Sequence, residues 1–231
     1  MNDLRDKVVV VTGAARGQGA GEVAALLDAG ACVVACDRAW PADHLTGVGV
    51  HAEKHLLRRE LDVADPAAWS ALAVELAGQF GTIHGLVNNA GIALRSRLGE
   101  VEIEAWNRVF AVNATGPMLG IQTLSTLMPP GSSIVNVGSL AAVTAHAAIA
   151  YTSSKWALRG LSRVASMQLG ERGIRVNLVN PGFIETPMTA AAPEIFRQAN
   201  LKNSAMPRAG TVGDIVPVVL FLLSAQSAFI T

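Results

Sequence analysis

Short apolar runs alternate with longer segments of helical periodicity along the whole chain. This alternation predicts a parallel sheet whose strands are joined by crossover helices, because strands buried on both faces read as continuous apolar runs. The segment 55–61 (HLLRREL) has the weakest strand pattern of the set. We expect six strands, at 7–12, 31–36, 55–61, 83–88, 133–138 and 174–179.

Apolar residues at helical spacing predict helices between these strands. Asp65 and Pro66 mark one helix start, as an N-cap followed by a residue that needs no N–H in the first turn. Further helical patterns cover 101–128, 150–171 and 212–224. The last is apolar on nearly all sides and is expected to be buried, with Pro217 predicting a late start or a bend. The apolar faces expected are Ala20, Val23, Ala24 and Leu27; Trp69, Leu72, Ala73, Leu76 and Phe80; and Ala157, Leu158, Leu161, Val164, Ala165 and Leu169.

The pattern shows no internal repeat, low-complexity tract or interdomain linker. We therefore expect one α/β domain over 1–231, with a doubly wound, mostly parallel sheet and helices on both faces. Eighteen basic and eighteen acidic residues give no net field to attract nucleic acid or an anionic membrane. The charged amino terminus lacks the pattern of a signal peptide, and the chain has no apolar run long enough for a membrane span. A cytoplasmic protein is therefore expected.

Two cysteines, Cys32 and Cys36, lie four residues apart in a predicted strand. At roughly 3.3 Å per residue their Cα atoms are roughly 13 Å apart, which is too far for a disulfide. The histidines have no metal-ligand spacing, and we expect no metal site.

The first strand is followed by the glycine-rich segment TGAARGQG. Gly13, Gly17 and Gly19 allow a tight turn and a close approach of the backbone to a pyrophosphate, which the next helix start attracts. An ordinary glycine-rich turn is the alternative. Asp37 ends the second strand, 18 residues after Gly19, where an acid can accept hydrogen bonds from the ribose hydroxyls of NAD.

Two arginines complicate this cofactor assignment. Arg38 follows Asp37 in the sequence, and Arg16 lies in the glycine-rich segment. An arginine beside the ribose can accept the 2′-phosphate of NADP. Because Asp37 repels that phosphate, NAD is expected, with NADP as the alternative.

The only tyrosine, Tyr151, is followed four residues later by Lys155 in YTSSK. On a helix the two share a face, and a fixed ammonium together with an oxidised nicotinamide favours the ionised phenol. Such a group can move the proton that accompanies hydride transfer at a carbinol carbon. A helix-start tyrosine with a solvated lysine is the structural alternative.

Several further segments occur with these motifs: LDV at 61–63, NNAG at 88–91, VNATG at 112–116, VNVGS at 135–139 and NPGFIETPM at 180–188. Together they resemble, in order, the motifs of the short-chain dehydrogenase/reductase family over nearly the whole chain. Within it, the chain is most similar to bacterial secondary-alcohol dehydrogenases of the hydroxysteroid type, notably through MNDL at its start and PMTA at 187–190. The resemblance implies a Rossmann fold, a nicotinamide cofactor and a homotetramer.

The resemblance also implies roles for single residues. Tyr151 is the proton donor and acceptor, Lys155 binds the nicotinamide ribose and lowers the tyrosine pKa, and Ser139 holds the substrate oxygen. Asn113 supports a proton relay through water. The remaining cofactor positions implied are Asp62 and Val63 at the adenine, Asn89, Ala90 and Gly91 along the cofactor, and Pro181, Gly182, Ile184 and Thr186 around the nicotinamide.

The chain departs from the family pattern at three places. Ser139 precedes Tyr151 by 12 positions, one fewer than in most members. Gln18 replaces the usual aliphatic residue between Gly17 and Gly19 and is expected to contact the cofactor. The chain stops at Thr231, where relatives continue into a last strand and tail, so we expect a missing carboxyl-terminal tail.

The expected activity is the interconversion of a secondary alcohol and a ketone. Small and apolar residues around 92–98, 140–149 and 187–206 favour a hydrophobic alcohol or ketone, cyclic or steroid-like. An NADPH-dependent 3-oxoacyl thioester reductase and a non-catalytic NAD(P)-binding sensor are the two alternatives.

Overall fold

Six parallel strands form one sheet in the order β3-β2-β1-β4-β5-β6. This structure is a computed structural model and describes residues 4–40, 55–190, 192–202 and 204–231. All six predicted strands are confirmed, with ends that differ by one or two residues. The strands are β1 (Val8–Thr12), β2 (Cys32–Asp37), β3 (Leu56–Glu60), β4 (Gly85–Asn88), β5 (Ser133–Val137) and β6 (Arg175–Val179).

The polar strand β3 is explained by its place in the sheet. It pairs with β2 at one edge, and its side chains are exposed or half-buried, whereas every residue of the central strands β1, β4 and β5 is buried. An edge strand needs fewer apolar side chains and benefits from charged ones. Arg58 and Arg59 are therefore compatible with β3.

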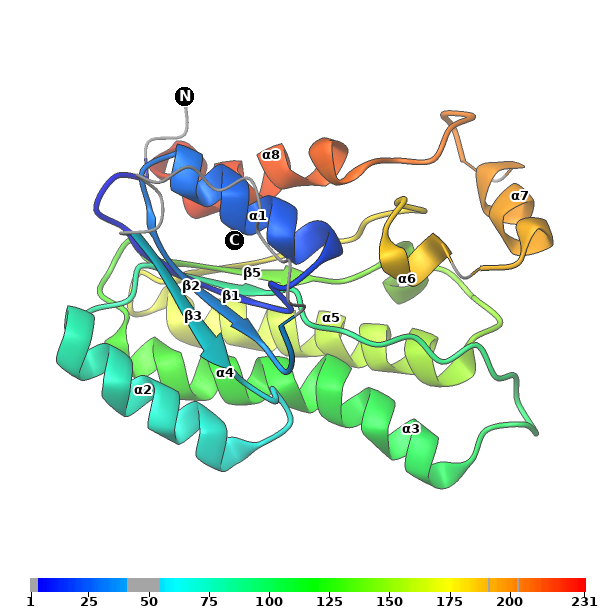
Figure 1. Cartoon of the computed structure of the whole chain (residues 1–231), viewed down its shortest axis with the longest axis horizontal. Coiled ribbons are helices and arrows are strands. Elements are labelled where there is room, and N and C mark those ends of the chain that lie inside the picture. Colours follow the sequence, from blue (N-terminus) through cyan, green and yellow to red (C-terminus); the bar gives the residue numbers. More distant parts are fainter. Residues whose placement is uncertain (1–3, 41–54, 191, 203) are drawn as a thin grey trace.

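Helices cover both faces of the sheet (Figure 1). One layer contains α1 and α8, which pack on each other, and the other contains α2, α3, α4 and α5. Two apolar clusters fill the spaces between these layers and the sheet. The helices are α1 (Gly17–Asp28), α2 (Pro66–Phe80), α3 (Ile103–Phe110), α4 (Gly116–Leu124), α5 (Ile149–Gly170), α6 (Pro187–Ala190), α7 (Glu194–Lys202) and α8 (Val212–Leu223).

The start of α2 agrees with the sequence pattern. Asp65 is its N-cap, and its carboxylate accepts a hydrogen bond from the Ala67 N–H at 2.8 Å. Trp69 is fully buried, and its ring N–H donates to the Val63 carbonyl at 2.9 Å. This contact joins α2 to the segment that follows β3.

Two expected helix faces need correction. The buried face of α1 contains Glu22, Val23 and Leu26, whereas Ala24 is exposed. On α5, Val164 is exposed, and the buried side includes polar Ser154 and Lys155. These faces were misjudged because buried polar residues on α1 and α5 take positions that the apolar pattern assigns to solvent.

The last helix was also only partly predicted. Of the two outcomes expected from Pro217, a late start or a bend, the late start is excluded, because α8 begins at Val212 and Pro217 lies inside the helix. The helix is buried on one side only, because Pro217 and Val218 are exposed. A capping box between Thr211 and Asp214 fixes its start.

The expected helical segment 101–128 is interrupted. A π-turn at Ala111–Thr115 separates α3 from α4. The extra residue in such a turn rotates the following side chains, and π-turns often occur at functional sites. Here the π-turn contains the candidate residue Asn113.

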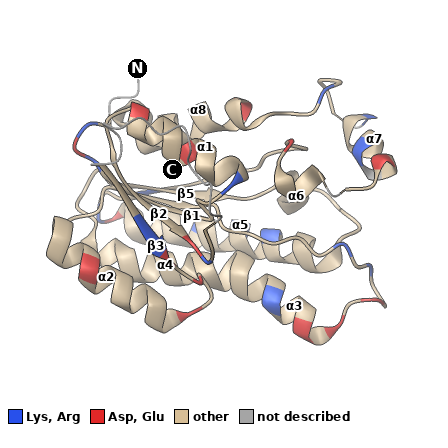
Figure 2. Ribbon diagram, in the orientation of Figure 1, with Lys and Arg blue, Asp and Glu red and all other residues tan. Residues whose placement is uncertain are grey.

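The strand order places a crevice at the middle of the sheet. The chain winds outward through β2 and β3 from β1 and then returns to β4 on the other side of β1. Ligands bind at the carboxyl ends of the strands beside such a switch point. Acidic and basic residues are interspersed along the described ribbon (Figure 2). None of the described helices is both long and apolar enough to cross a membrane.

Candidate active site

A cleft of about 720 Å³ lies at the carboxyl ends of the strands. Nearly all of the site residues predicted from the sequence line it, although they come from segments far apart in the chain. Gly19 and Asn113 do not line it but lie directly behind its wall. The predicted residues that line the cleft are Gly13, Arg16, Gly17, Gln18, Asp37, Arg38, Asp62, Val63, Asn89, Ala90, Gly91, Ser139, Tyr151, Lys155, Pro181, Gly182, Ile184 and Thr186.

The glycine-rich turn between β1 and α1 has no room for side chains at two positions. Gly13 has φ 65°, in the left-handed region that favours glycine. A Cβ atom on Gly19 would collide with the Gly13 carbonyl oxygen and the Asn89 side-chain amide. The turn thus presents bare backbone and the N–H groups of α1 to the cleft, which is the arrangement that binds phosphates.

Thr12 and Asn89 hold this turn against the segment after β4. The Asn89 amide donates to the carbonyls of Thr12 and Gly13 at 3.0 and 3.1 Å. In return, the Thr12 hydroxyl accepts from the N–H groups of Asn89 and Ala90, both at 3.1 Å. Thr12 therefore positions two strand ends, a role that its sequence context did not reveal.

The Asp37 carboxylate lies at the end of β2 and contacts the glycine-rich turn. Its Oδ2 accepts a hydrogen bond from the Ala15 N–H at 2.9 Å. Its Oδ1 lies 3.4 Å from the Ala39 N–H. Because Arg16 and Arg38 line the same cleft, one acid and two bases surround the position predicted for the adenosine ribose.

Asp62 forms an ion pair that no sequence motif predicted. Its Oδ2 lies 2.9 Å from the Arg108 guanidinium on α3, and its Oδ1 accepts from the Ala64 N–H. Burial raises the pKa of Asp62, but these hydrogen bonds and the charges of Arg108 and Arg38 together lower it by a larger amount. The net pKa is therefore below its ordinary value. Arg108 also lines the cleft and is a further candidate for contact with the cofactor.

Tyr151 and Lys155 face the cleft from the first two turns of α5. The Lys155 Nζ lies 5.8 Å from the centre of the Tyr151 ring and donates to the Val137 carbonyl at 2.8 Å. The Lys155 side chain is buried, and this burial lowers its pKa to about 8. Ser139 lies close enough to the Tyr151 side chain to lower its pKa.

The pKa of Tyr151 in the protein alone lies above its ordinary value. Burial raises it, and the side chain of Ser139 lowers it only in part. The sequence-based expectation of a lowered pKa relied on the charges of Lys155 and of an oxidised nicotinamide. Without the nicotinamide charge, burial has the larger effect.

Ser139 is held at the shortened loop between β5 and α5. Its N–H donates to the Asn180 side chain at 3.2 Å, and its hydroxyl accepts from the Ala141 N–H at 3.2 Å. The Leu140 N–H donates to the Pro181 carbonyl at 2.8 Å. The loop is therefore joined to the segment after β6, and the short spacing keeps Ser139 beside Tyr151.

Asn113 connects the π-turn to two other walls of the site. Its amide is fully buried and makes paired 2.9 Å hydrogen bonds with the N–H and carbonyl of Ile92. Its Nδ2 also donates to Ser154 Oγ at 3.0 Å, which in turn donates to the Tyr151 carbonyl. Asn113 thus fixes the post-β4 segment relative to α5.

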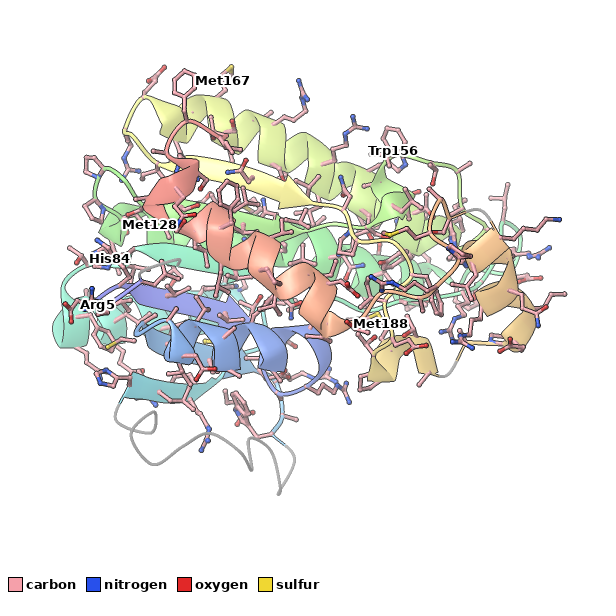
Figure 3. All side chains as sticks on the ribbon, turned by 90° about the horizontal axis from the view of Figure 1, so that it is seen from above. Arg5, His84, Met128, Trp156, Met167 and Met188 are labelled. Atoms are coloured by element: carbon pink, nitrogen blue, oxygen red, sulfur yellow. The ribbon has the colours of Figure 1, made fainter. Side chains whose placement is uncertain are left out.

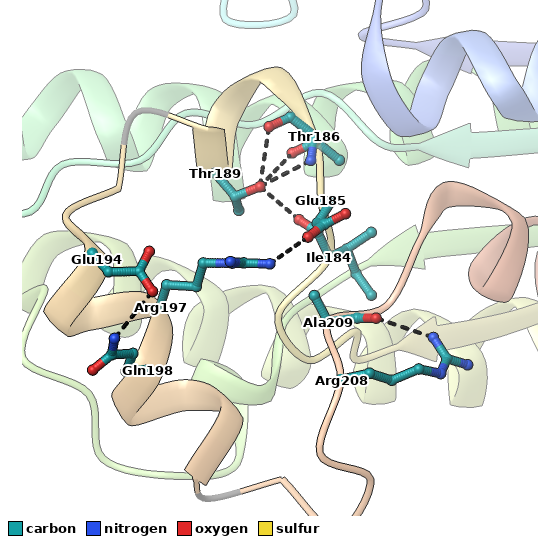
Figure 4. A network of polar contacts seen from close by, with 9 residues as sticks. All are labelled: Ile184, Glu185, Thr186, Thr189, Glu194, Arg197, Gln198, Arg208 and Ala209. Atoms are coloured by element: carbon teal, nitrogen blue, oxygen red, sulfur yellow. Dashed lines mark hydrogen bonds and ion pairs between the residues drawn. The ribbon is translucent and has the colours of Figure 1, made fainter.

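Thr186 and Thr189 form a local network after β6 (Figure 4). The Thr189 hydroxyl accepts from the Thr186 N–H at 2.9 Å and donates to the Ile184 carbonyl at 2.6 Å. Thr189 and Met188 both line the cleft; neither was singled out from the sequence, although both lie in the predicted substrate segment 187–206. The repeated threonine in TPMT, typical of hydroxyl-capped turns, is the signal that could have identified Thr189.

Within the part of the chain that the structure describes, no group of three or more His, Cys, Asp or Glu side chains could hold a metal ion. Both cysteines are free thiols. The predicted substrate segment 187–206 includes Ala191 and Asn203, which lie outside the described residues, as do the first three residues of the MNDL motif.

Comparison with known proteins supports one family assignment. Residues 13–231 match a protein-family model described as enoyl-(acyl carrier protein) reductase. The chain is 35% identical to trans-4-hydroxycyclohexanecarboxylate dehydrogenase of Sinomonas cyclohexanicum, over 99% of this chain and 90% of that protein. It is 37% identical to 3-alpha-(or 20-beta)-hydroxysteroid dehydrogenase of Mycobacterium tuberculosis strain H37Rv, over 99% and 86% of the two chains.

A solved structure shows the same family likeness. A mutant of a Serratia marcescens short-chain dehydrogenase/reductase superimposes with a TM-score of 0.91 at 32% identity, covering 99% of this chain and 95% of that one. The chain belongs to the short-chain dehydrogenase/reductase family, and the predicted doubly wound fold is confirmed.

Burial of Lys155 predicts a measurable dependence of stability on pH. A lysine whose pKa falls from 10.5 to about 8 on folding costs on the order of 3 kcal/mol while it is charged. The unfolded chain binds this proton more tightly, so the cost is complete below pH 8 and disappears as pH rises from 8 to 10.5. Lys155→Met should therefore raise the free energy of unfolding at pH 7 by about 1–3 kcal/mol, an advantage that shrinks toward pH 10.

Urea unfolding of both proteins between pH 7 and 10 measures this difference. Lys202→Met, at an exposed lysine at the end of α7, is the matched control and should show no such trend. A difference in the free energy of unfolding between wild type and Lys155→Met that does not change with pH would contradict the lowered pKa of Lys155.

Proposed function

We propose that the protein is an NAD(H)-dependent oxidoreductase that interconverts a secondary alcohol and a ketone. The observation that carries this proposal is the convergence of Ser139, Tyr151 and Lys155 on one wall of the cleft. A binding protein without chemistry has no need for an acid/base group, a hydroxyl and a buried ammonium at one place. The geometry therefore favours an enzyme over a nucleotide sensor.

The cleft has the features that a nicotinamide dinucleotide requires. Gly13 presents bare backbone to the cleft beside the start of α1, and a Cβ atom on Gly19 behind it would collide with the Gly13 carbonyl oxygen. Asp37 lies at the end of β2, beside this turn, where it can accept hydrogen bonds from the adenosine ribose. Gly91 lies close to both Asn113 Oδ1 and Lys155 Nζ. When bound, the nicotinamide supplies or accepts the hydride at the carbinol carbon.

The residues of the chain then provide orientation and proton transfer. Ser139 holds the substrate oxygen, and the Tyr151 hydroxyl gives or takes the proton at that oxygen. The Lys155 ammonium, oriented by the Val137 carbonyl, binds the nicotinamide ribose and stabilises the ionised phenol. Asn113 positions the post-β4 segment and Tyr151 through Ser154 and supports a water-mediated proton relay.

We propose NAD as the cofactor. The fixed Asp37 carboxylate lies at the position proposed for the 2′-phosphate of NADP, and these two negative charges would repel each other. Arg16 and Arg38 act in the opposite direction, which keeps NADP as the alternative. The two carboxylate oxygens are oriented by Ala15 and Ala39, so the acid does not need to move to contact the ribose.

A hydrophobic, cyclic alcohol or ketone is the proposed substrate. Ile92, Ala93 and Met188 add apolar surface to the cleft that Tyr151 also lines. Met188, on α6 and labelled in Figure 3, is 46% exposed. Two relatives are named for cyclic hydroxy compounds, a hydroxycyclohexanecarboxylate and a hydroxysteroid. The matching family model is described by an acyl-carrier-protein reductase, which makes an acyl thioester reductase the second candidate.

The setting of the enzyme is also part of the proposal. Two free cysteines agree with a reducing cytoplasm. The family resemblance supports a homotetramer, for which exposed Met167 and Val164 on α5 provide apolar surface. We further propose that residues 1–231 act as one dinucleotide-binding and catalytic domain.

Tyr151→Phe tests the catalytic assignment. We expect NADH affinity to change less than about threefold while the turnover of cyclic ketones falls by about 10²–10⁴, the usual size of a lost general acid. NADH fluorescence and steady-state rates on a panel of ketones and acyl thioesters measure the two effects. Trp156→Phe, on the same helix but away from the cleft lining (Figure 3), is the control and should remain active.

Equal turnover by wild type and Tyr151→Phe would contradict the role of Tyr151. Turnover of acyl thioesters but not of free ketones would replace the proposed substrate class with the second candidate.

Asp37→Asn tests the choice of cofactor. Asparagine keeps an oxygen for the Ala15 N–H but removes the charge, so the glycine-rich turn should remain in place. We expect NADPH affinity to rise at least tenfold, about 1.4 kcal/mol, and NADH affinity to fall by a smaller factor. Binding titrations of both cofactors measure this change, with Asp28→Asn at the exposed end of α1 as control. Tighter binding of NADPH than NADH by the wild type would contradict the NAD assignment.

A further inference from the structure

Glu22 is a carboxylic acid in the core of the protein. It lies on α1, one turn after Gln18, and its side chain is 0% exposed. It is the only acid among the buried side chains of the described residues. Buried acids are rare unless paired, and no ion pair in the described residues includes Glu22.

Only one side-chain hydrogen bond is formed by this carboxyl group. The Gln18 Nε2 donates to Glu22 Oε1 at 3.0 Å, whereas Oε2 is buried and has no hydrogen-bond partner. Burial raises the pKa of Glu22 to about 8, and the hydrogen bond from Gln18 lowers it only in part. At neutral pH the group is therefore a neutral acid, with a proton available to donate.

No charge among the described residues accounts for this state. α1 packs against β1, β2 and α8. The titratable groups on α1 and these elements are Asp28 on α1, Cys32, Cys36 and Asp37 on β2, and Asp214 on α8, and none of them contributes to the pKa of Glu22. Arg16, just before α1, does not contribute either.

Gln18 connects this buried acid to the cleft. Its side chain is half-buried, and the residue lines the cleft at the second position of α1, where a dinucleotide phosphate would lie. In this structure the NH₂ donor of its amide faces Glu22 and the carbonyl acceptor lies on the opposite side. A half-turn of the last torsion exchanges the two, so that the carbonyl faces Glu22 and the NH₂ faces away. Whichever side faces Glu22, the opposite side faces away from it.

We propose that Glu22, as a neutral acid, is a positioning residue that donates its proton to the Gln18 carbonyl oxygen and thereby directs the Gln18 NH₂ group toward a bound dinucleotide. This inference rests on the proposed use of NAD(H). Ionised Glu22 can only accept, so it holds the Gln18 NH₂ and leaves the carbonyl oxygen for the cleft. An anionic pyrophosphate favours the donor and disfavours both the carbonyl and a buried negative charge nearby.

The consequence is a coupling between dinucleotide binding and the proton on Glu22. NADH should bind the neutral form, and its affinity should fall as Glu22 ionises. Glu22→Gln cannot ionise, but its amide can still serve as donor or acceptor to Gln18 and has nearly the same shape. It therefore separates the proton from the packing. The titration of Lys155, which also affects binding, is present in both proteins and cancels in their ratio.

The experiment is a titration with NADH of wild type and Glu22→Gln between pH 6.5 and 9.5, followed by fluorescence. We expect equal Kd values within about twofold at pH 6.5 and a wild-type Kd at least tenfold higher at pH 9.5. Asp28→Asn, which removes an exposed acid from the same helix, is the matched control and should follow the wild type.

A second measurement uses the wild-type protein alone. In difference infrared spectra of the wild type at pH 8.5, the C=O band of a protonated carboxylic acid should grow when NADH binds. This readout remains decisive if Glu22→Gln does not fold.

A Kd ratio that stays constant with pH, or no growth of the acid band on binding, would overturn the role of Glu22 and leave the proposed function intact. Absence of NADH binding by the wild type at every pH would overturn both.

Discussion

The buried ammonium of Lys155 is the constraint on which the arrangement of the cleft depends. A charged group that is 4% exposed must have fixed polar partners, and here the Val137 carbonyl at the end of β5 is one of them. This contact sets the position of α5 relative to the sheet and brings Tyr151 beside Ser139. Asn113 completes the wall, because its hydrogen bonds join the π-turn, the post-β4 segment and α5. Polar groups therefore occupy inward-facing positions of α5 and the π-turn, where a helix with a purely structural role would have apolar side chains.

The features predicted from the sequence are those with strong local signals. Strands buried on both faces have continuous apolar runs, and even the edge strand β3 was found. The glycine turn and the pair of Tyr151 and Lys155 were recognisable because their chemistry requires fixed spacing. The shared direction of parallel strands then explains why motifs far apart in the chain line one cleft.

Other features depend on packing that no local pattern reports. The π-turn interrupts a segment that reads as one continuous helix, and the ion pair of Asp62 and Arg108 joins positions 46 residues apart. Glu22 occupies a buried position on α1 that an apolar residue would ordinarily take, whereas Ala24 of the expected face is exposed. The errors therefore gather where buried polar groups replace hydrophobic ones near the site, as expected when function competes with packing.

The central claim is that a nicotinamide bound in the cleft transfers hydride to the carbonyl carbon of a ketone, while a residue of the chain supplies the proton to the oxygen. The most direct measurement is the reduction of a cyclic ketone in ordinary water with NADH in which deuterium replaces both hydrogens at nicotinamide C4. Mass spectrometry and NMR then locate deuterium in the alcohol product. We predict one deuterium on the carbinol carbon of every product molecule. A product without deuterium at that carbon, or no alcohol from any ketone while NADH is bound, would contradict the account.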